Sequence, residues 1–210
     1  MSKIDELAKA VEEGRSKIAG QLAQEALDEG ASPAELLEAM SEAMNTVGDL
    51  FSKGEIFVPE MLIAAKAMNK GLEVINPLLQ GEGAVSLGKC IIGTVKGDLH
   101  DIGKNLVNTM IGAAGFEMID LGVDVPVDKF IETIEANPDV KIVALSALLT
   151  TTMASMTETI EALKPLRDKY GFKIMIGGAP ISQGFADENG ADAYTVDAGA
   201  AAVKAKELAS

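Results

Sequence analysis

The sequence predicts an N-terminal bundle of four α-helices followed by an α/β domain with a doubly wound, five-stranded parallel sheet. Two observations predict this fold class. Apolar residues recur every three or four positions from about residue 2 to residue 79, which is typical of amphipathic helices. Beyond a short stretch of small and polar residues, runs rich in isoleucine and valine alternate with helical stretches, as in a parallel sheet that helices cover on both faces.

Three breaks divide the first 80 residues into four predicted helices. They lie at Gly14, at residues 30–33 and at Gly54. Ser32 followed by a proline makes a good helix start, because serine caps the first amide groups and proline fits the first helical position. Glu35 is the third residue after this cap. Four consecutive helices with short connections favour an antiparallel bundle.

The helical pattern stops at residues 80–84, where small and polar residues predict a linker. We expect a helical domain over residues 1–80, a linker over 81–88 and an α/β domain over 89–210. The α/β domain contains four clear apolar runs and a weaker fifth, without alternation between apolar and polar residues. These predicted strands cover residues 90–95, 116–121, 140–148, 173–176 and 193–196. Such an arrangement is typical of flavodoxin-like or Rossmann-like folds.

Composition excludes several classes of partner. Lysine and arginine number 18 against 32 aspartates and glutamates, a net charge of -14, which would repel nucleic acids and anionic membrane surfaces. The single cysteine excludes an internal disulfide, and the N-terminal residues lack the apolar stretch of a secretory signal. No apolar segment approaches the roughly 18 residues of a membrane span. We therefore expect a cytoplasmic protein.

The only histidine, His100, lies between Asp98 and Asp101 in the loop that should leave the first strand. One imidazole is too few for a metal site built from protein alone, but it suffices as an axial ligand when a macrocycle supplies the other positions. Open α/β sheets bind ligands at this carboxyl edge. The loop therefore indicates a tetrapyrrole-like cofactor. The alternative is an ordinary turn in which an aspartate caps the next helix and His100 is only solvated.

Small and hydroxyl residues end the next two strands at the same edge. Ser146 and the threonines from Thr150 to Thr152 follow the third strand, and Gly177 and Gly178 follow the fourth. Such residues leave space for a bulky group between strands and can hydrogen-bond it. Taken singly, they are also explained as turn-forming glycines and helix-capping threonines.

A phosphate-binding loop is excluded at residues 97–103. A P-loop has four residues between its glycines and a serine or threonine after its lysine, whereas here five residues separate the glycines and Asn105 follows Lys104. Cys90, within the first strand, is most simply a small buried apolar residue.

The pattern Asp98-x-His100-x-x-Gly103, followed by Ser146-x-Leu148 and a glycine pair, resembles the corrinoid-binding signature of cobalamin-dependent methyltransferases. Residues 47–51 and 57–60 are similar to the helical cap that precedes this domain in methionine synthase. A chain of cap plus corrinoid domain resembles the corrinoid proteins that serve the demethylation of methylamines, methanol, methoxylated aromatics or quaternary amines such as betaine.

The resemblance implies a cobalamin-type corrinoid with His100 as the lower axial ligand of cobalt. Asp98 would hold the other ring nitrogen, and Thr152 would extend the hydrogen-bond chain, so that the three residues couple protonation to the redox and methylation state of the metal. From the cap, Phe51 and Val58 would cover the upper face of the corrin. The other implied cofactor contacts are Asp101, Ile102, Gly103, Ser146, Leu148, Thr150, Gly177 and Gly178.

The resemblance also implies a methyl shuttle. A substrate-specific methyltransferase would place a methyl group on cobalt(I), and a second methyltransferase would pass it to tetrahydrofolate or a thiol; a reductive activase is a further expected partner. The chain would be one component of a multi-subunit methyltransferase, because a substrate-activating (β/α)₈ barrel alone takes about 250 residues.

Other functions remain open at this level. The main alternative is a corrinoid storage or sensor module, although the acidic N-terminal helices argue against a sensor that binds DNA. A detached subunit of a radical mutase and a signalling domain like that of response regulators are further alternatives.

Overall fold

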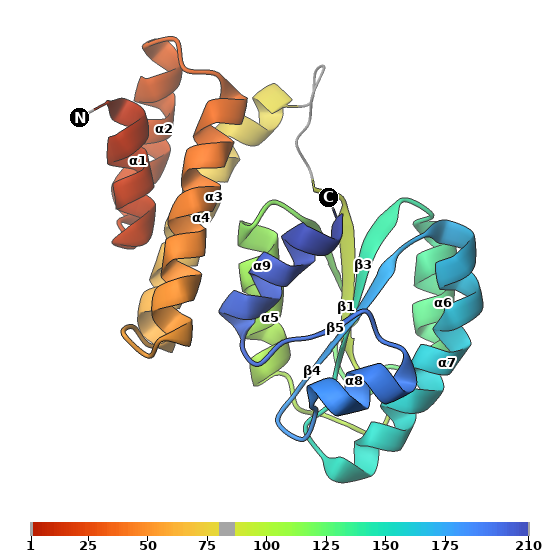
Figure 1. Cartoon of the computed structure of the whole chain (residues 1–210). Helices are drawn as coiled ribbons and strands as arrows, with labels where there is room; N and C mark the ends of the chain where they lie inside the picture. The colour runs from red at the N-terminus through yellow and green to blue at the C-terminus, as the bar shows by residue number, and fades with distance from the viewer. Residues whose placement is uncertain (1, 80–86, 210) are drawn as a thin grey trace. The chain divides into compact units, whose positions relative to one another are not determined.

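The computed structural model describes residues 2–79 and 87–209, which form two compact units, one helical and one α/β (Figure 1). The linker prediction at residues 80–84 lies outside the described residues. Each unit is described by itself below. Within the described residues, no helix combines the length and apolar character that crossing a bilayer requires.

The helical unit consists of the four predicted helices, α1 (Lys3–Glu12), α2 (Ser16–Asp28), α3 (Pro33–Ser52) and α4 (Val58–Leu79). Helix α3 begins as predicted: Ser32 Oγ accepts the backbone N–H of Glu35 at 3.2 Å, and the Glu35 carboxylate accepts that of Ser32 at 2.8 Å. Helix α1 packs against α3, and α2 against α4. The bundle interior is apolar and includes Leu7, Val11, Leu36, Met40, Met61, Met68 and Ile75, all buried.

The α/β unit contains one sheet of five parallel strands, as predicted. The strands are β1 (Lys89–Thr94), β2 (Glu117–Asp120), β3 (Val140–Ser146), β4 (Lys173–Gly177) and β5 (Ala193–Tyr194), and their order is β2-β1-β3-β4-β5. Strand β3 ends at Ser146 rather than at residue 148, because the backbone N–H of Leu148 donates to Asp98 instead of continuing the ladder. Strand β5 is only two residues long.

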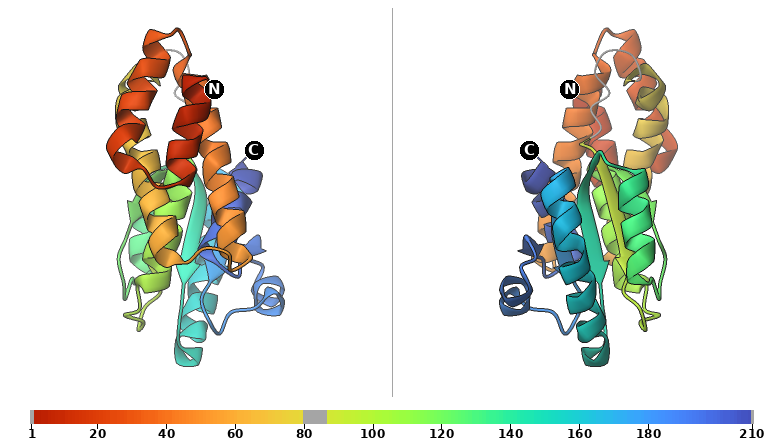
Figure 2. Two further views of the ribbon diagram at one scale, coloured as in Figure 1. Left: turned by 90° about the vertical axis from the view of Figure 1, so that its left-hand side faces the viewer. Right: turned by 90° about the vertical axis from the view of Figure 1, so that its right-hand side faces the viewer.

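Helices cover both faces of the sheet. Helices α5 (Ile102–Ala113) and α9 (Ala198–Ala209) lie on one face, and α6 (Val127–Ala136) and α7 (Met153–Tyr170) on the other (Figures 1 and 2). Helix α8 (Gln183–Asn189) packs against α7. Beneath α6 and α7, residues such as Ile91, Val143 and Ile174 pack with Phe130 and Ile160 in one buried cluster.

The strand order places a switch point between β1 and β3. From β1 the chain crosses to β2 on one side, whereas β3, β4 and β5 follow one another on the other side. The loops after β1 and β3 lead to helices on opposite faces of the sheet, and they lie at the carboxyl edge where open α/β sheets bind ligands.

Candidate functional site

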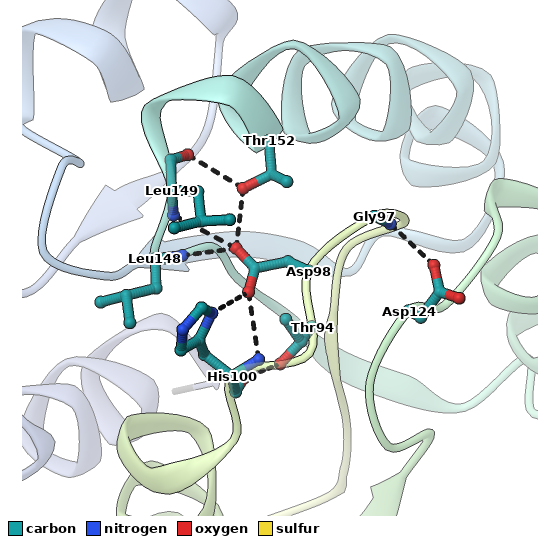
Figure 3. Close-up of polar contacts among 8 residues, drawn as sticks. All are labelled: Thr94, Gly97, Asp98, His100, Asp124, Leu148, Leu149 and Thr152. Atoms are coloured by element: carbon teal, nitrogen blue, oxygen red, sulfur yellow. Dashed lines mark hydrogen bonds and ion pairs between the residues drawn. The ribbon is translucent and has the colours of Figure 1, made fainter.

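Asp98 is the centre of the site. It lies in the loop after β1, and its side chain is fully buried. Its Oδ1 accepts hydrogen bonds from the ring Nδ1 of His100 at 2.7 Å and from the backbone N–H of His100 at 3.1 Å (Figure 3). Its Oδ2 accepts from the backbone N–H of Leu148 and from Thr152 Oγ1, both at 2.7 Å. One carboxylate thus joins the loops that follow β1 and β3.

The loop after β3 is shaped to meet this carboxylate. Ala147 still donates its N–H to the carbonyl of Gly177 at 3.2 Å, but the next two N–H groups, of Leu148 and Leu149, turn toward Asp98. A 3₁₀ turn, Thr150–Thr152, then brings the hydroxyl of Thr152 to the same oxygen. The predicted pair of Asp98 and Thr152 is therefore in direct contact.

The surroundings of Asp98 favour its ionised form. Burial by itself penalises the charge, but the hydrogen bonds from Thr152, Leu148 and His100 together outweigh that penalty and hold the pKa of the carboxyl well below its ordinary value. The site thus contains a fixed negative charge beside the imidazole.

His100 presents its second ring nitrogen outward. Its side chain is 49% exposed, and no hydrogen bond to Nε2 is found among the described residues. Because Nδ1 faces a carboxylate, the proton of the neutral ring belongs on Nδ1, and Nε2 carries the free lone pair. The hydroxyl of Thr94, at the end of β1, donates to the backbone carbonyl of His100 at 2.9 Å and so fixes the loop to the strand. An imidazole held in this way can serve as a metal ligand.

Exposed apolar residues lie on the same loops as this imidazole and the groups that bond to Asp98. Leu99 and Ile102 are 71% and 79% exposed, and Leu148 and Leu149 are both 41% exposed. Clustered exposed apolar residues mark binding surfaces. Across residues 2–79 and 87–209 no group of three His, Cys, Asp or Glu could hold a metal ion by itself. One imidazole donor, on loops that also expose large apolar residues, fits a metal that a large, flat macrocycle carries.

Sequence reasoning missed Leu99 and Leu149, and also Val196, which follows β5 and is 77% exposed. Loops at the carboxyl ends of strands are usually polar, so large apolar residues at those positions were the available signal. Asp101, by contrast, is exposed, and its carboxylate accepts the side-chain amide of Asn105 at 3.1 Å. Asp101 therefore bonds to helix α5 and takes no part in the hydrogen bonds around Asp98.

The predicted residues at the ends of β3 and β4 do share one edge. Ser146 pairs with Gly177 in the sheet register, and Thr150 is exposed in the following turn. Gly178 has a φ of +131°, and a Cβ there would lie 1.8 Å from the carbonyl oxygen of Ala147. The fold itself therefore requires glycine at position 178. At Gly103, φ is not positive and a Cβ would meet nothing within 4 Å.

The two predicted cap residues lie at one end of the helical unit. Phe51 is near the end of α3 and Val58 begins α4, and both are partly buried. Phe57, in the connection between these helices, is 66% exposed and was not predicted as a site residue. The contact of Phe51 and Val58 with a cofactor stays a prediction.

Comparisons with known proteins agree with this chemistry. Two family models, each described as a B12 binding domain, match the chain, one over residues 88–206 and the other over residues 3–76. Dimethylamine corrinoid protein 1 of Methanosarcina acetivorans is 45% identical over 179 residues, which cover 84% of this chain and 83% of that protein. The trimethylamine corrinoid protein of Methanosarcina barkeri is 43% identical over 201 residues, which cover 94% and 92%.

Solved structures give the same result. A cobalamin-binding protein from Desulfitobacterium hafniense has a TM-score of 0.82 at 30% identity and covers 98% of both chains. The methanol:cobalamin methyltransferase complex of Methanosarcina barkeri has a TM-score of 0.77 at 28% identity, covering 97% of this chain and 78% of that one. A helical unit followed by a B12 binding domain, with close corrinoid relatives along nearly the whole length, shows that the chain belongs to the family of B12-binding corrinoid proteins.

Proposed function

We propose that this corrinoid protein is a methyl shuttle of a multi-component methyltransferase system. It would receive a methyl group through a substrate-specific methyltransferase and yield it to a second methyltransferase that serves tetrahydrofolate or a thiol. The names of its relatives, which are dimethylamine and trimethylamine corrinoid proteins, favour a methylated amine as the donor. The observation that carries the proposal is the imidazole of His100, held at Nδ1 by Asp98 and open at Nε2.

In this proposal, Nε2 of His100 would be the ligand that the chain supplies to the cobalt. When bound, the corrinoid supplies a cobalt centre that can accept and release a methyl group. The exposed apolar residues Leu99, Ile102, Leu148 and Leu149 would receive the ring and exclude water around the imidazole. Ser146, Thr150 and the glycine pair at the end of β4 would lie along the rest of the cofactor.

The site would also have to hold a proton on the imidazole whenever it is not bound to the metal. The ionised Asp98, which lies 2.7 Å from Nδ1, would stabilise an imidazolium through a charge-assisted hydrogen bond. Thr152 Oγ1 lies 2.7 Å from Asp98 Oδ2 and 2.9 Å from the carbonyl of Leu149, and its single proton can be donated to only one of them at a time. A proton on Asp98 Oδ2 would turn that hydroxyl toward Leu149.

Histidine labelling tests the axial role directly, because His100 is the only histidine of the chain. The full chain, reconstituted with cobalamin in the cobalt(II) state, should bind about one corrinoid and show nitrogen coupling in its electron paramagnetic resonance spectrum. The coupling that comes from histidine should change its pattern when ¹⁵N-histidine is supplied. This histidine coupling should vanish in His100→Ala. Asp139→Asn is the control, since this exposed carboxylate bonds to Lys89 at the opposite end of the sheet. A coupling that is insensitive to the label rejects His100 as the ligand.

The shuttle role is tested with methylated, reconstituted protein and methyltransferases from the same genome. Loss of the methyl group to tetrahydrofolate or to a thiol, dependent on one of these enzymes, is the expected result. Stable cofactor binding without transfer to either acceptor would instead support the storage or sensor function. A requirement for a reductive activase would appear as recovery of activity from oxidised protein when such an enzyme and a reductant are added.

A further inference from the structure

We propose that Asp124 is a positioning residue that holds the loop carrying Asp98 and His100. The proposal rests on the axial role of His100 proposed above. Asp124 Oδ1 accepts the backbone N–H of Gly97 at 2.7 Å (Figure 3). The backbone N–H of Asp124 also donates to the carbonyl oxygen of Asp98 at 2.9 Å. A single residue of the loop after β2 therefore forms hydrogen bonds to the loop after β1, one to Gly97 and one to Asp98.

The backbone of Asp124 is strained in a way that this grip explains. Its φ is +52°, and it is the only non-glycine residue with a positive φ in the part of the chain that the structure describes. Such a conformation persists where the surrounding structure enforces it, and it is often associated with functional sites. The strained position lies directly beside the loop of the candidate site.

The neighbours of Asp124 fix its place along the edge of β1. The backbone N–H of Thr94 donates to the carbonyl of Gly122, and that of Val125 donates to the carbonyl of Thr94, both at 3.0 Å. Val125 is also buried and bridges to Val95. With both flanks anchored, the left-handed turn at Asp124 directs its N–H and its carboxylate at the same loop.

The clamp acts on Gly97, which the side-chain bonds around Asp98 do not reach; a turn bond from the backbone N–H of Asp98 to the carbonyl of Val95, at 3.1 Å, spans it. The carboxylate of Asp98 is fixed by the loop after β3, and the carbonyl of His100 by Thr94. Gly97 lies between them and β1, with a φ of +86° that glycine adopts easily and can leave easily. The bond from Gly97 to Asp124 removes that freedom, which keeps Asp98 aligned with the ring of His100.

Two substitutions separate positioning from general stability. Asp124→Asn keeps an acceptor oxygen and a residue type that tolerates left-handed backbone. Asp124→Gly relieves the strain but removes the acceptor, so its melting temperature should stay near that of wild type. Asp139→Asn is the control, because this carboxylate bonds to Lys89 at the opposite end of the sheet.

The first measurement uses the full chain without cofactor. Hydrogen exchange of the Gly97 amide, followed by NMR, should be faster by about tenfold in Asp124→Gly, from loss of one charge-assisted hydrogen bond. Asp124→Asn should stay within about threefold of wild type, and the control should be unchanged. Unaltered exchange at Gly97 in Asp124→Gly would overturn the clamp.

The second measurement uses the reconstituted cobalt(II) protein. A fraction of Asp124→Gly should lose the histidine nitrogen coupling, and Asp124→Asn should retain it. Faster exchange at Gly97 together with full coupling would show that the loop loosens without affecting the ligand, and would reject the positioning role. Absence of histidine coupling in wild type would instead reject the axial function of His100, while the exchange experiment would still decide the clamp.

Discussion

Replacing Asp98 by asparagine tests all the hydrogen bonds that converge on this carboxylate, because it exchanges one acceptor oxygen for an NH₂ group. The carboxylate is fully buried and accepts donors on both oxygens, from the backbone and ring of His100 on one side and from Leu148 and Thr152 on the other. An amide can accept on only one side, because its nitrogen is a donor. Every orientation of the asparagine therefore creates a conflict.

The size of that conflict follows from the contacts. With the amide nitrogen toward His100, the backbone N–H of His100 is left without its acceptor; with the nitrogen toward β3, the N–H of Leu148 is left. A buried unsatisfied donor costs about 1–3 kcal/mol, and the remaining bonds lose the roughly twofold strengthening that a charged acceptor gives. We expect Asp98→Asn to lower the free energy of unfolding of the α/β unit by about 2–4 kcal/mol.

The assay is urea unfolding of the cofactor-free chain, followed by tyrosine fluorescence. The chain has no tryptophan, and its two tyrosines, Tyr170 and Tyr194, both lie in the α/β unit, so the signal reports that unit alone. Asp101→Asn, which changes an exposed carboxylate, should stay within about 0.5 kcal/mol of wild type.

The pH dependence has a definite sign. The pKa of Asp98 is lower in the folded protein than its ordinary value of about 3.9. Its ionisation therefore stabilises wild type fully above about pH 5, and this contribution is lost as the pH falls through 4 toward the folded pKa. In Asp98→Asn, the slope of stability against pH below 4 should be smaller by up to about 1.4 kcal/mol per unit. An unchanged slope, or a loss below about 1 kcal/mol at neutral pH, would refute the reasoning.

Three further predictions concern other positions. Gly178→Ala should destabilise the α/β unit by about 2–4 kcal/mol in the same unfolding assay, because its Cβ would collide with the backbone of Ala147. Gly103→Ala should leave stability equal or raise it by up to about 1 kcal/mol, since α5 contains this residue and the space is open, yet it should weaken cobalamin binding as measured by equilibrium titration. Phe51→Ala should accelerate photolysis of the methylated, reconstituted protein while leaving the histidine coupling intact; unchanged photolysis would make Phe51 a residue of the bundle core only.

The fold was largely predictable because its signals are local. The capping pair of Ser32 and Glu35 and the breaks at Gly14 and Gly54 depend on neighbouring residues, and the helices that they predict are present. The end of β3 was not predictable, because an apolar run that includes Leu148 gives no sign that its N–H bonds to a carboxylate 50 residues earlier. Strand ends that serve a site follow tertiary contacts rather than local preference.

The site was predictable only in part for a related reason. Asp98 and His100 are two residues apart, so their contact is local in sequence. Thr152 reaches Asp98 across 54 residues, and this contact was expected only from the resemblance, because it depends on the β1 and β3 ends being neighbours. Asp124 carried no signal at all. A single aspartate in a loop gives no indication of a left-handed backbone or of a bond to Gly97, both of which arise from the way its flanks are anchored to β1.

The glycines show how structure can separate reasons that sequence treats alike. Gly178 was expected to make space for a cofactor and Gly103 to contact it, but Gly178 has a sufficient cause in the fold, because its backbone approaches Ala147. Gly103 has no such cause: its φ is ordinary, its surroundings are open, and alanine would favour the helix that contains it. Because the isolated chain does not require glycine at position 103, we expect the requirement to come from the bound cofactor. The opposite responses expected of Gly103→Ala, in stability and in cobalamin binding, would locate that need at the cofactor.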